Sequence, residues 1–245
     1  MGPTSTSTSE EWPKAWWAVA YFGVYFGYLW LTVESELAHW VSLVLLPWAL
    51  LWWIGRRSEP RLRFRDVGRR LGLAWPPHGR GMGVAVILVL AIQGIQLLNE
   101  TQRREVLSVL SSSRAVWAVP AALVFALLTA GFTEEFFFRG ILQRSLSARF
   151  RSGLIGVIGT SIAFSLYHVP YAYLNPFWPS AGDLSEALRL AFTNGLMGGI
   201  VLGIVFIRAR STLLPCILVH AAVDWMPVIR LFGRMSFQFG GGASP

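Results

Sequence analysis

The chain has 245 residues, of which 54% are hydrophobic and only 14% are charged, whereas a soluble domain usually carries about 25% charged residues. This composition excludes an ordinary soluble domain and indicates a polytopic membrane protein with no room for a second large domain. The net charge of +8 does not indicate binding to nucleic acid, because the arginines cluster between apolar runs, where membrane topology explains them. The single cysteine, Cys216, excludes an intrachain disulfide and a thiolate metal site.

A polar segment opens the chain, and seven apolar runs follow it. Residues 1–13 are rich in Ser and Thr and are predicted to be disordered. They lack the basic region of a signal peptide, so we expect the first run to be retained. The runs have about 17 to 22 residues, enough to cross a hydrocarbon core of about 30 Å, and the fourth is expected to continue as a helix to Phe150. The seven runs are 14–33, 37–54, 82–98, 115–132, 154–169, 188–207 and 213–229.

The segments between the runs predict the topology. Residues 56–80 carry eight arginines and several prolines, and most of the other basic residues fall on the same side of the membrane. The positive-inside rule therefore predicts a cytoplasmic N-terminus and a basic cytoplasmic loop at 56–80. Residues 151–153 are predicted to form a turn, and Pro170 is predicted to end the fifth run.

The predicted fold class is therefore all-α, a transmembrane bundle of about seven to eight helices. Residues 14–114 are assigned to accessory transmembrane helices and residues 115–230 to a catalytic core. Residues 231–245 end in a Gly-rich stretch and are predicted to be a flexible tail. Gly195, Gly199 and Gly203 recur every four residues, which predicts a small-residue face for close helix packing.

Ionisable residues inside apolar runs are costly and need a partner or a task. Among the acidic residues, Glu134, Glu135 and Asp224 are assigned to the apolar runs. Among the four histidines, His168 and His220 are assigned to them. This set, found by predicted burial alone, has the chemical groups needed for acid–base catalysis.

The spacing of these residues predicts how they meet. Arg139 lies four residues after Glu135, so the two are expected to pair on one helix face, whereas Glu134 lies about 100° around the helix. Glu134 lies 17 residues before Arg151 in the predicted turn, and His168 lies 17 residues after it. Two antiparallel helices joined there would hold these two side chains at one depth.

The remaining groups complete a possible hydrolytic site. Asp224 lies four residues after His220 on the same helix face, and Phe164 lies four residues before His168. A desolvated carboxylate facing a histidine can activate water. A second polar pair can face the carbonyl oxygen, where oxyanion charge develops. This arrangement fits hydrolysis of an amide bond in a segment that enters the membrane.

Simpler interpretations of the same residues remain open. A lone histidine in a membrane helix is more often a hydrogen-bonded packing residue, and the Glu-Glu pair with Arg139 can be a structural ion pair. One glutamate, two histidines and one aspartate can also bind zinc, although no H-E-x-x-H helix is present. A metal-dependent intramembrane hydrolase is therefore one alternative, and a non-proteolytic immunity or scaffold protein is another.

These residues resemble the motifs of the CAAX protease and bacteriocin-processing family, also called the ABI family, of intramembrane endopeptidases. The motifs are E-E-x-x-x-R, F-x-x-x-H and H-x-x-x-N or H-x-x-x-D. Their order and separation agree with the family core over about residues 116–225. The matching residues are Glu134, Glu135 and Arg139, then Phe164 and His168, then His220 and Asp224.

The resemblance implies glutamate-type proteolysis without an obligatory metal or other cofactor. It implies that Glu134 and His168 activate the water, that His220 and Asp224 support the oxyanion, and that Glu135, Arg139 and Phe164 are structural. An ionised aspartate cannot donate to an oxyanion, so Asp224 would orient His220 instead. The expected partners are the lipid bilayer and a protein or peptide with a membrane-embedded segment, in a bacterial inner membrane.

Overall fold

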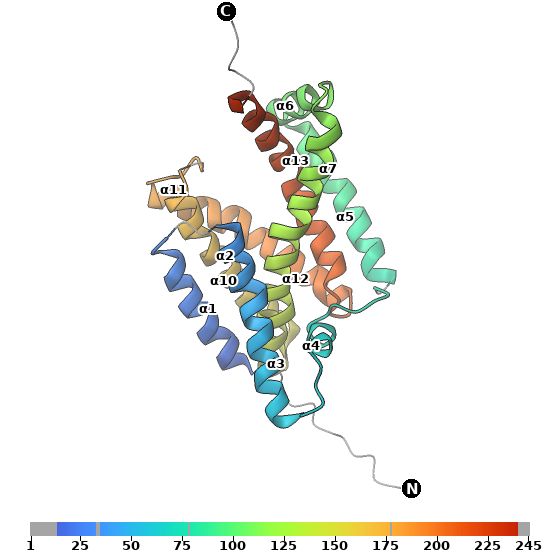
Figure 1. The fold of residues 1–245 in the computed structure, drawn as a ribbon, viewed down its shortest axis with the longest axis vertical. Helices are drawn as coiled ribbons and strands as arrows, with labels where there is room; N and C mark the ends of the chain where they lie inside the picture. The colour runs from blue at the N-terminus through green and yellow to red at the C-terminus, as the bar shows by residue number, and fades with distance from the viewer. Residues whose placement is uncertain (1–13, 33–34, 78, 177, 240–245) are drawn as a thin grey trace, which may run out of the picture. The chain divides into compact units, whose positions relative to one another are not determined.

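The computed structural model describes residues 14–32, 35–77, 79–176 and 178–239, which are helical without a strand (Figure 1). The all-α class is therefore confirmed. The predicted disordered segment at 1–13 lies outside the described residues. Within the described part, six helices are long and apolar enough to cross a membrane, as expected of an integral membrane protein. They are Glu36–Ser58, Gly79–Leu98, Ala115–Phe150, Gly153–Leu174, Leu184–Arg208 and Leu214–Phe232.

The first predicted run gives a shorter helix than expected. Helix α1 covers Ala15–Leu29, only 15 residues, or about 22 Å at 1.5 Å per residue, which is less than the hydrocarbon core. Its C-terminal turn tightens, because Trp30 N–H bonds to the Gly27 carbonyl and Leu31 N–H to the Tyr28 carbonyl. Such three-residue bonds commonly close a helix, and apolar composition alone does not reveal them.

The chain divides into two compact units. One contains residues 1–34 and 138–203, and the other contains residues 35–137 and 204–245. The division crosses two continuous helices, Ala115–Phe150 and Leu184–Arg208. Each unit is described by itself below.

The first unit contains a hairpin of α9, Arg144–Phe150, and α10, Gly153–Leu174. Arg151 has the left-handed conformation that ends many helices, with φ of 51°, and the Ser152 side chain accepts the Ile155 N–H to cap α10. The predicted turn at 151–153 is thus confirmed. The predicted end at Pro170 is wrong, because α10 runs on to Leu174; membrane helices tolerate a proline whose freed carbonyl finds other partners.

The glycine face of the next span packs against α10 within the same unit. This span comprises α11, Leu184–Leu190, a π-helical segment η4, Ala191–Gly195, and α12, Leu196–Arg208. A Cβ atom at Gly195 would lie 3.2 Å from Ser165 Cα, and one at Gly199 would lie 3.0 Å from Ser161 Cα. The packing role predicted for these glycines is confirmed, and α10 itself occupies their face.

Replacing Gly199 by alanine should lower the free energy of unfolding by about 1–3 kcal/mol, the usual cost of overpacking a close contact. Gly198 is the matched control, because a Cβ there would meet nothing within 4 Å. Gly198→Ala should be neutral or stabilise the helix by about 0.5–1 kcal/mol, since alanine is the better helix former. Thermal unfolding of both variants in one detergent tests the prediction, and equal shifts would contradict it.

The second unit is built around α13, Leu214–Phe239. Figure 1 shows α5, α6 and α7 beside α13. Gln93 donates to the Ala222 carbonyl and Gln96 to the Val223 carbonyl, which ties α5 to the middle of α13. The other helices of this unit are α2, Glu36–Trp40; α3, Leu46–Ser58; α4, Phe64–Arg70; α5, Gly79–Leu98; α6, Glu100–Leu110; and α7, Ala115–Ala126.

Three predicted connections contain more helix than expected. Helix α13 continues to Phe239, so the first nine residues of the tail predicted at 231–245 are helical, and residues 240–245 lie outside the described part; the flexibility of the tail stays a prediction. The basic loop contains α4, and the polar connector after α5 contains α6. Arginines dominate the composition of α4, which is why the sequence analysis predicted a loop. Val67 and Leu71 are nevertheless buried at a spacing of four residues, as in a short amphipathic helix.

Candidate functional site

Glu134, predicted to be catalytic, and Glu135, predicted to be structural, lie between two π-helical segments. Helix α8, Thr133–Glu135, is flanked by η2, Leu127–Phe132, and η3, Phe136–Gln143. Bonds between residues five apart replace the α-helical pattern in such segments, which often occur at functional sites. The stretch from Glu135 to Arg139 therefore runs through π-helical turns instead of the regular α-helix that the sequence analysis assumed. The two residues belong to different units, and their pairing stays a prediction.

Within the second unit, α8 and α13 bring together four of the seven predicted site residues, Glu134, Glu135, His220 and Asp224. His220 Nδ1 lies 2.8 Å from Glu135 Oε1. His220 Nε2 lies 3.7 Å from Glu134 Oε2 and 3.5 Å from Asp224 Oδ2. Glu134, Glu135 and His220 are buried, whereas a third of the Asp224 side chain is exposed. The predicted proximity of Glu134 to His220, and of His220 to Asp224, is confirmed.

A glycine allows the two helices to meet at this point. A Cβ atom at Gly131 would lie 2.9 Å from the Ile217 carbonyl oxygen and 3.4 Å from Ala221 Cβ. The backbone of η2 therefore approaches α13 about one turn before the carboxylates. This approach lets the imidazole on α13 reach Glu135 directly.

The geometry fixes the hydrogen-bonding roles of the His220 ring. A carboxylate can only accept, so the Nδ1–H of His220 donates to Glu135. Nε2 then faces Glu134 and Asp224, and it donates only when the ring is doubly protonated. Glu135 thus orients His220. The sequence did not predict this role, because the adjoining π-helical turns decide on which side of the helix the Glu135 side chain lies.

A buried histidine that the sequence analysis left out also belongs to this region. His39 lies inside the span Glu36–Ser58 and is only 8% exposed, so restricting the intramembrane histidines to 168 and 220 was wrong. Its Nε2 lies 2.8 Å from Thr133 Oγ1, and the Thr133 hydroxyl donates to the Thr129 carbonyl. Nε2–H of His39 is therefore the donor to Thr133, immediately before Glu134. The position of His39 inside an apolar run was the feature of the sequence that could have identified it as an intramembrane histidine.

Replacing His39 by leucine should lower the free energy of unfolding by about 0.5–1.5 kcal/mol, the usual net value of a hydrogen bond. Thr133→Val should cost a similar amount, and the double variant should cost less than the two together, because both changes remove one bond. His39→Gln is the matched control, since its amide can still donate. Unfolding curves for the four variants measure the coupling, and strictly additive losses would contradict it.

The first unit holds the other predicted residues, Arg139, Phe164 and His168. His168 Nδ1 lies 2.8 Å from the Phe164 carbonyl oxygen, so Nδ1–H donates and Nε2 is the nitrogen that can accept a proton. The rings of Phe164 and His168 meet edge to face with centroids 4.6 Å apart. The predicted contact between these two residues is confirmed, whereas the position of His168 relative to Glu134 stays a prediction.

Arg139 is fully buried within the first unit. Its guanidinium carbon lies 4.7 Å from the centre of the Phe164 ring, and Nη2 donates to the Gly199 carbonyl over 3.4 Å. Gln143, four residues later, donates to the Gly203 carbonyl, four residues after Gly199. The glycines on α12 thus leave carbonyls accessible to these two side chains. Arg139 thus connects Phe164 on α10 with α12, and its structural role stays a prediction.

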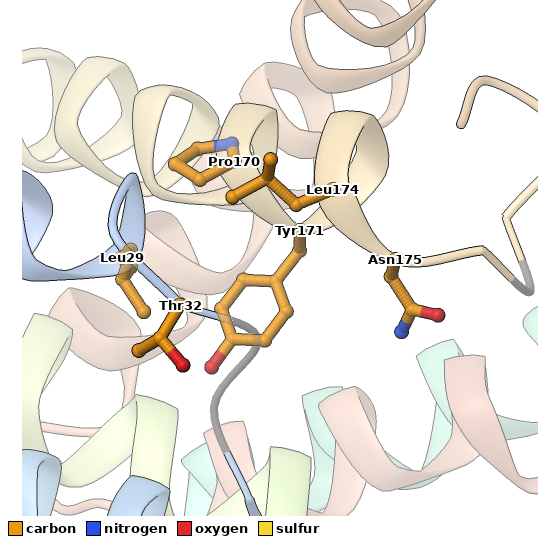
Figure 2. A pocket seen from close by; sticks show the side chains of 6 residues that line it. All are labelled: Leu29, Thr32, Pro170, Tyr171, Leu174 and Asn175. Atoms are coloured by element: carbon orange, nitrogen blue, oxygen red, sulfur yellow. The ribbon is translucent and has the colours of Figure 1, made fainter. Parts of the chain in front are cut away.

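A small pocket also lies in the first unit, shortly after His168 in sequence. Figure 2 shows the hydroxyls of Thr32 and Tyr171 pointing toward one another, with Asn175 at the side. Leu29, Pro170 and Leu174 complete the lining. Its volume of about 10 Å³ is near the minimum that holds one water molecule. This pocket is too small for a peptide and is not a substrate site.

Over residues 14–32, 35–77, 79–176 and 178–239, no three His, Cys, Asp or Glu side chains are grouped in a way that could hold one ion. Between His220 and Glu135 the Nδ1 nitrogen carries the proton of a hydrogen bond. Chelation of zinc from the purified protein therefore tests whether its activity depends on the metal.

Comparison with known proteins adds one match. A family model described as type II CAAX prenyl endopeptidase Rce1-like matches residues 115–226. No curated protein and no solved structure matches the chain. The matched region is a little under half of the chain, and all seven predicted site residues fall inside it. The family resemblance predicted from the three motifs is thus confirmed over residues 115–226, which are similar to the Rce1-like family of type II CAAX prenyl endopeptidases.

Proposed function

We propose that this protein is an intramembrane endopeptidase that uses Glu134 to activate water. The observation that carries the proposal is the buried cluster of Glu134, Glu135 and His220 on two apolar helices, inside the region that matches the endopeptidase family. Buried ionisable groups in membrane helices are a functional signal by themselves. The family match gives that signal a reaction class, the hydrolysis of a peptide bond.

In the proposed reaction, Glu134 acts as the general base. Its carboxylate removes a proton from water while the water oxygen bonds to the carbonyl carbon of the substrate. The resulting tetrahedral intermediate expels the amine, which takes the proton from Glu134, and the carboxylate is restored. General acid–base catalysis of this kind contributes about 10²–10⁴ in rate. A site shielded from bulk water also protects the base from competing hydrogen bonds.

His220 is the proposed donor to the oxyanion. Nδ1–H is held by Glu135, so Nε2–H of the doubly protonated ring is the donor available toward the substrate side. Asp224 Oδ2 lies 3.5 Å from Nε2 and can accept from it before substrate arrives. An aspartate in this position orients the ring and does not itself donate, which explains how an acid serves at position 224.

His168 is the proposed partner of Glu134 in holding the water. Its Nδ1–H donates to the Phe164 carbonyl, so Nε2 is the ring nitrogen that can accept a hydrogen bond from water. This tautomer is the one a water-orienting histidine needs. Arg139 and Phe164 support it through the contacts described above, and no metal takes part in this mechanism.

The proposed substrate is a protein or peptide precursor with a membrane-anchored or C-terminally tagged segment. The site residues lie within candidate membrane spans, so a bond reaches them when its flanking segment enters the membrane. We place the enzyme in a bacterial inner membrane with a cytoplasmic N-terminus, following the arginine distribution. The printed family description names prenyl endopeptidases, and a prenylated substrate is one member of this class.

Comparing protein termini in membranes that contain the wild type or Glu134→Gln tests the function directly. The wild type should generate one set of new termini close to predicted membrane segments, and the variant should not. New termini that persist with the Glu134→Gln variant but disappear on zinc chelation would favour the metal-dependent alternative. A phenotype that survives Glu134→Gln and His168→Gln without any new termini would favour the immunity or scaffold alternative.

A further inference from the structure

The basic segment between Ser58 and Gly79 joins two candidate membrane spans, so it lies at one membrane surface. It folds back along α3 instead of extending away from it. Trp52 Nε1–H donates to the Leu62 carbonyl and Trp48 Nε1–H donates to the Phe64 carbonyl. Trp48 lies ten residues before Ser58, or roughly 15 Å along the helix axis.

Helix α4 therefore packs beside the last three turns of α3. The rings of Trp48 and Phe64 stack with centroids 4.9 Å apart, and a Cβ at Gly68 would lie 2.8 Å from the Trp48 ring. If these turns of α3 stood wholly in water, the rest of Glu36–Ser58 would be too short for a hydrocarbon core of about 30 Å. Helix α4 thus lies at the depth of the lipid head groups.

The aromatic side chains around α4 are those expected at the depth of the lipid head groups. Trp53, Phe64 and Trp75 are exposed, and exposed tryptophans are typical of the interface between membrane and water. Arg56 lies over the Trp52 ring and Arg57 over the Trp53 ring, at 5.0 Å and 3.9 Å from the ring centres.

Protein carboxylates leave most of the positive charge of this segment uncompensated. Residues 56–80, which include this segment, contain eight arginines, all exposed, and two acids. Arg70 donates to both oxygens of Glu59, and these bonds hold the pKa of Glu59 below its usual value. Asp66 accepts the Arg63 backbone N–H. Among the described residues, no ion pair to a carboxylate involves the four arginines that surround α4, which are Arg61, Arg63, Arg65 and Arg69.

We propose that α4 and its flanking arginines form a binding surface for anionic phospholipid head groups. A guanidinium binds a phosphate through two parallel hydrogen bonds, and basic segments next to membrane spans attract anionic lipids. The buried side of α4 is fixed against α3, so its arginines are held where lipid phosphates lie. This surface is independent of the proposed proteolytic site.

The experiment compares binding of phosphatidylglycerol and phosphatidylcholine, with the same acyl chains, to the full chain in neutral detergent. Native mass spectrometry counts the bound lipids, and thermal unfolding gives apparent affinity. The wild type should prefer phosphatidylglycerol roughly tenfold, and added salt should weaken this preference. Equal affinity for the two lipids would overturn the proposal.

Two charge-matched double variants locate the surface. Arg65→Gln with Arg69→Gln should remove most of the preference. Arg103→Gln with Arg104→Gln should retain it, because α6 follows α5 and so lies at the opposite membrane surface. Equal losses in both would overturn the proposal. Arg65→Lys with Arg69→Lys keeps the charge and should retain part of the preference, which excludes misfolding as the cause. Displacement of the lipid by millimolar glycerol 3-phosphate would assign the site to free phosphate and overturn the lipid assignment.

Discussion

Glu134→Gln should lower the rate of peptide hydrolysis by about 10²–10⁴, the contribution of a general base. Glutamine has nearly the same shape as glutamate but cannot take a proton from water. The loss should appear in kcat, because the change affects the chemical step and leaves the rest of the substrate-binding surface intact. Single-turnover cleavage of a substrate found by terminal proteomics measures it.

Glu100→Gln is the matched control for this prediction. Glu100 is an exposed carboxylate that pairs with Arg103 and Arg104 on α6, so the same chemical change there should leave kcat within about twofold, as expected of a surface substitution. Glu134→Gln should also unfold within a few degrees of the wild type. A Glu134→Gln protein that is folded and cuts at the wild-type rate would refute the mechanism.

His220→Phe should lower activity by about 10²–10³, the usual cost of removing one donor to an oxyanion. It should also lower the free energy of unfolding by about 1.5–3 kcal/mol, because a buried hydrogen bond to a carboxylate is lost. The two effects have different origins: Nε2 faces Glu134 and Asp224, whereas Nδ1 is bonded to Glu135. Activity and unfolding therefore have to be measured on the same preparation.

A double-variant cycle with Glu135→Leu separates the two effects. Leucine has no acceptor for Nδ1–H, so either change removes the same bond, and the stability losses of His220→Phe and Glu135→Leu should not add. Glu135→Leu alone should reduce activity less than His220→Phe, because it changes the orientation of the ring but keeps Nε2. Additive stability losses, or full activity in His220→Phe, would show that this contact is not used as proposed.

The apolar runs and the turn at Arg151 could be predicted from the sequence because each depends on local composition. Six of the seven runs gave helices long enough to span a membrane, and Arg151 ends α9 in the left-handed conformation. The short α1 and the long α13 could not be predicted, because hydrogen bonds in the last turn decide where a helix stops.

The sequence could predict those residues of the candidate site that are ionisable and lie inside apolar runs. Glu134, His220 and Asp224 were found because ionisable residues are rare in apolar runs, and they do meet. The contact between His220 and Glu135 was not predictable, because the sequence analysis assumed α-helical spacing on both sides of the acids. His39 was missed because it lies in the first turn of its span, where polar residues are common.

The π-helical segments on both sides of Glu134 and Glu135 constrain how this chain can change its length. Loss of one residue from Leu127–Phe132 would turn everything downstream by about 100° around the helix axis, so the carboxylates would leave the side that faces His220. Substitutions that keep the close approach at Gly131 are therefore tolerated in this stretch, whereas single-residue insertions and deletions are not. A sequence alignment that needs a gap between positions 127 and 143 would pair this domain with a chain that has lost the same site.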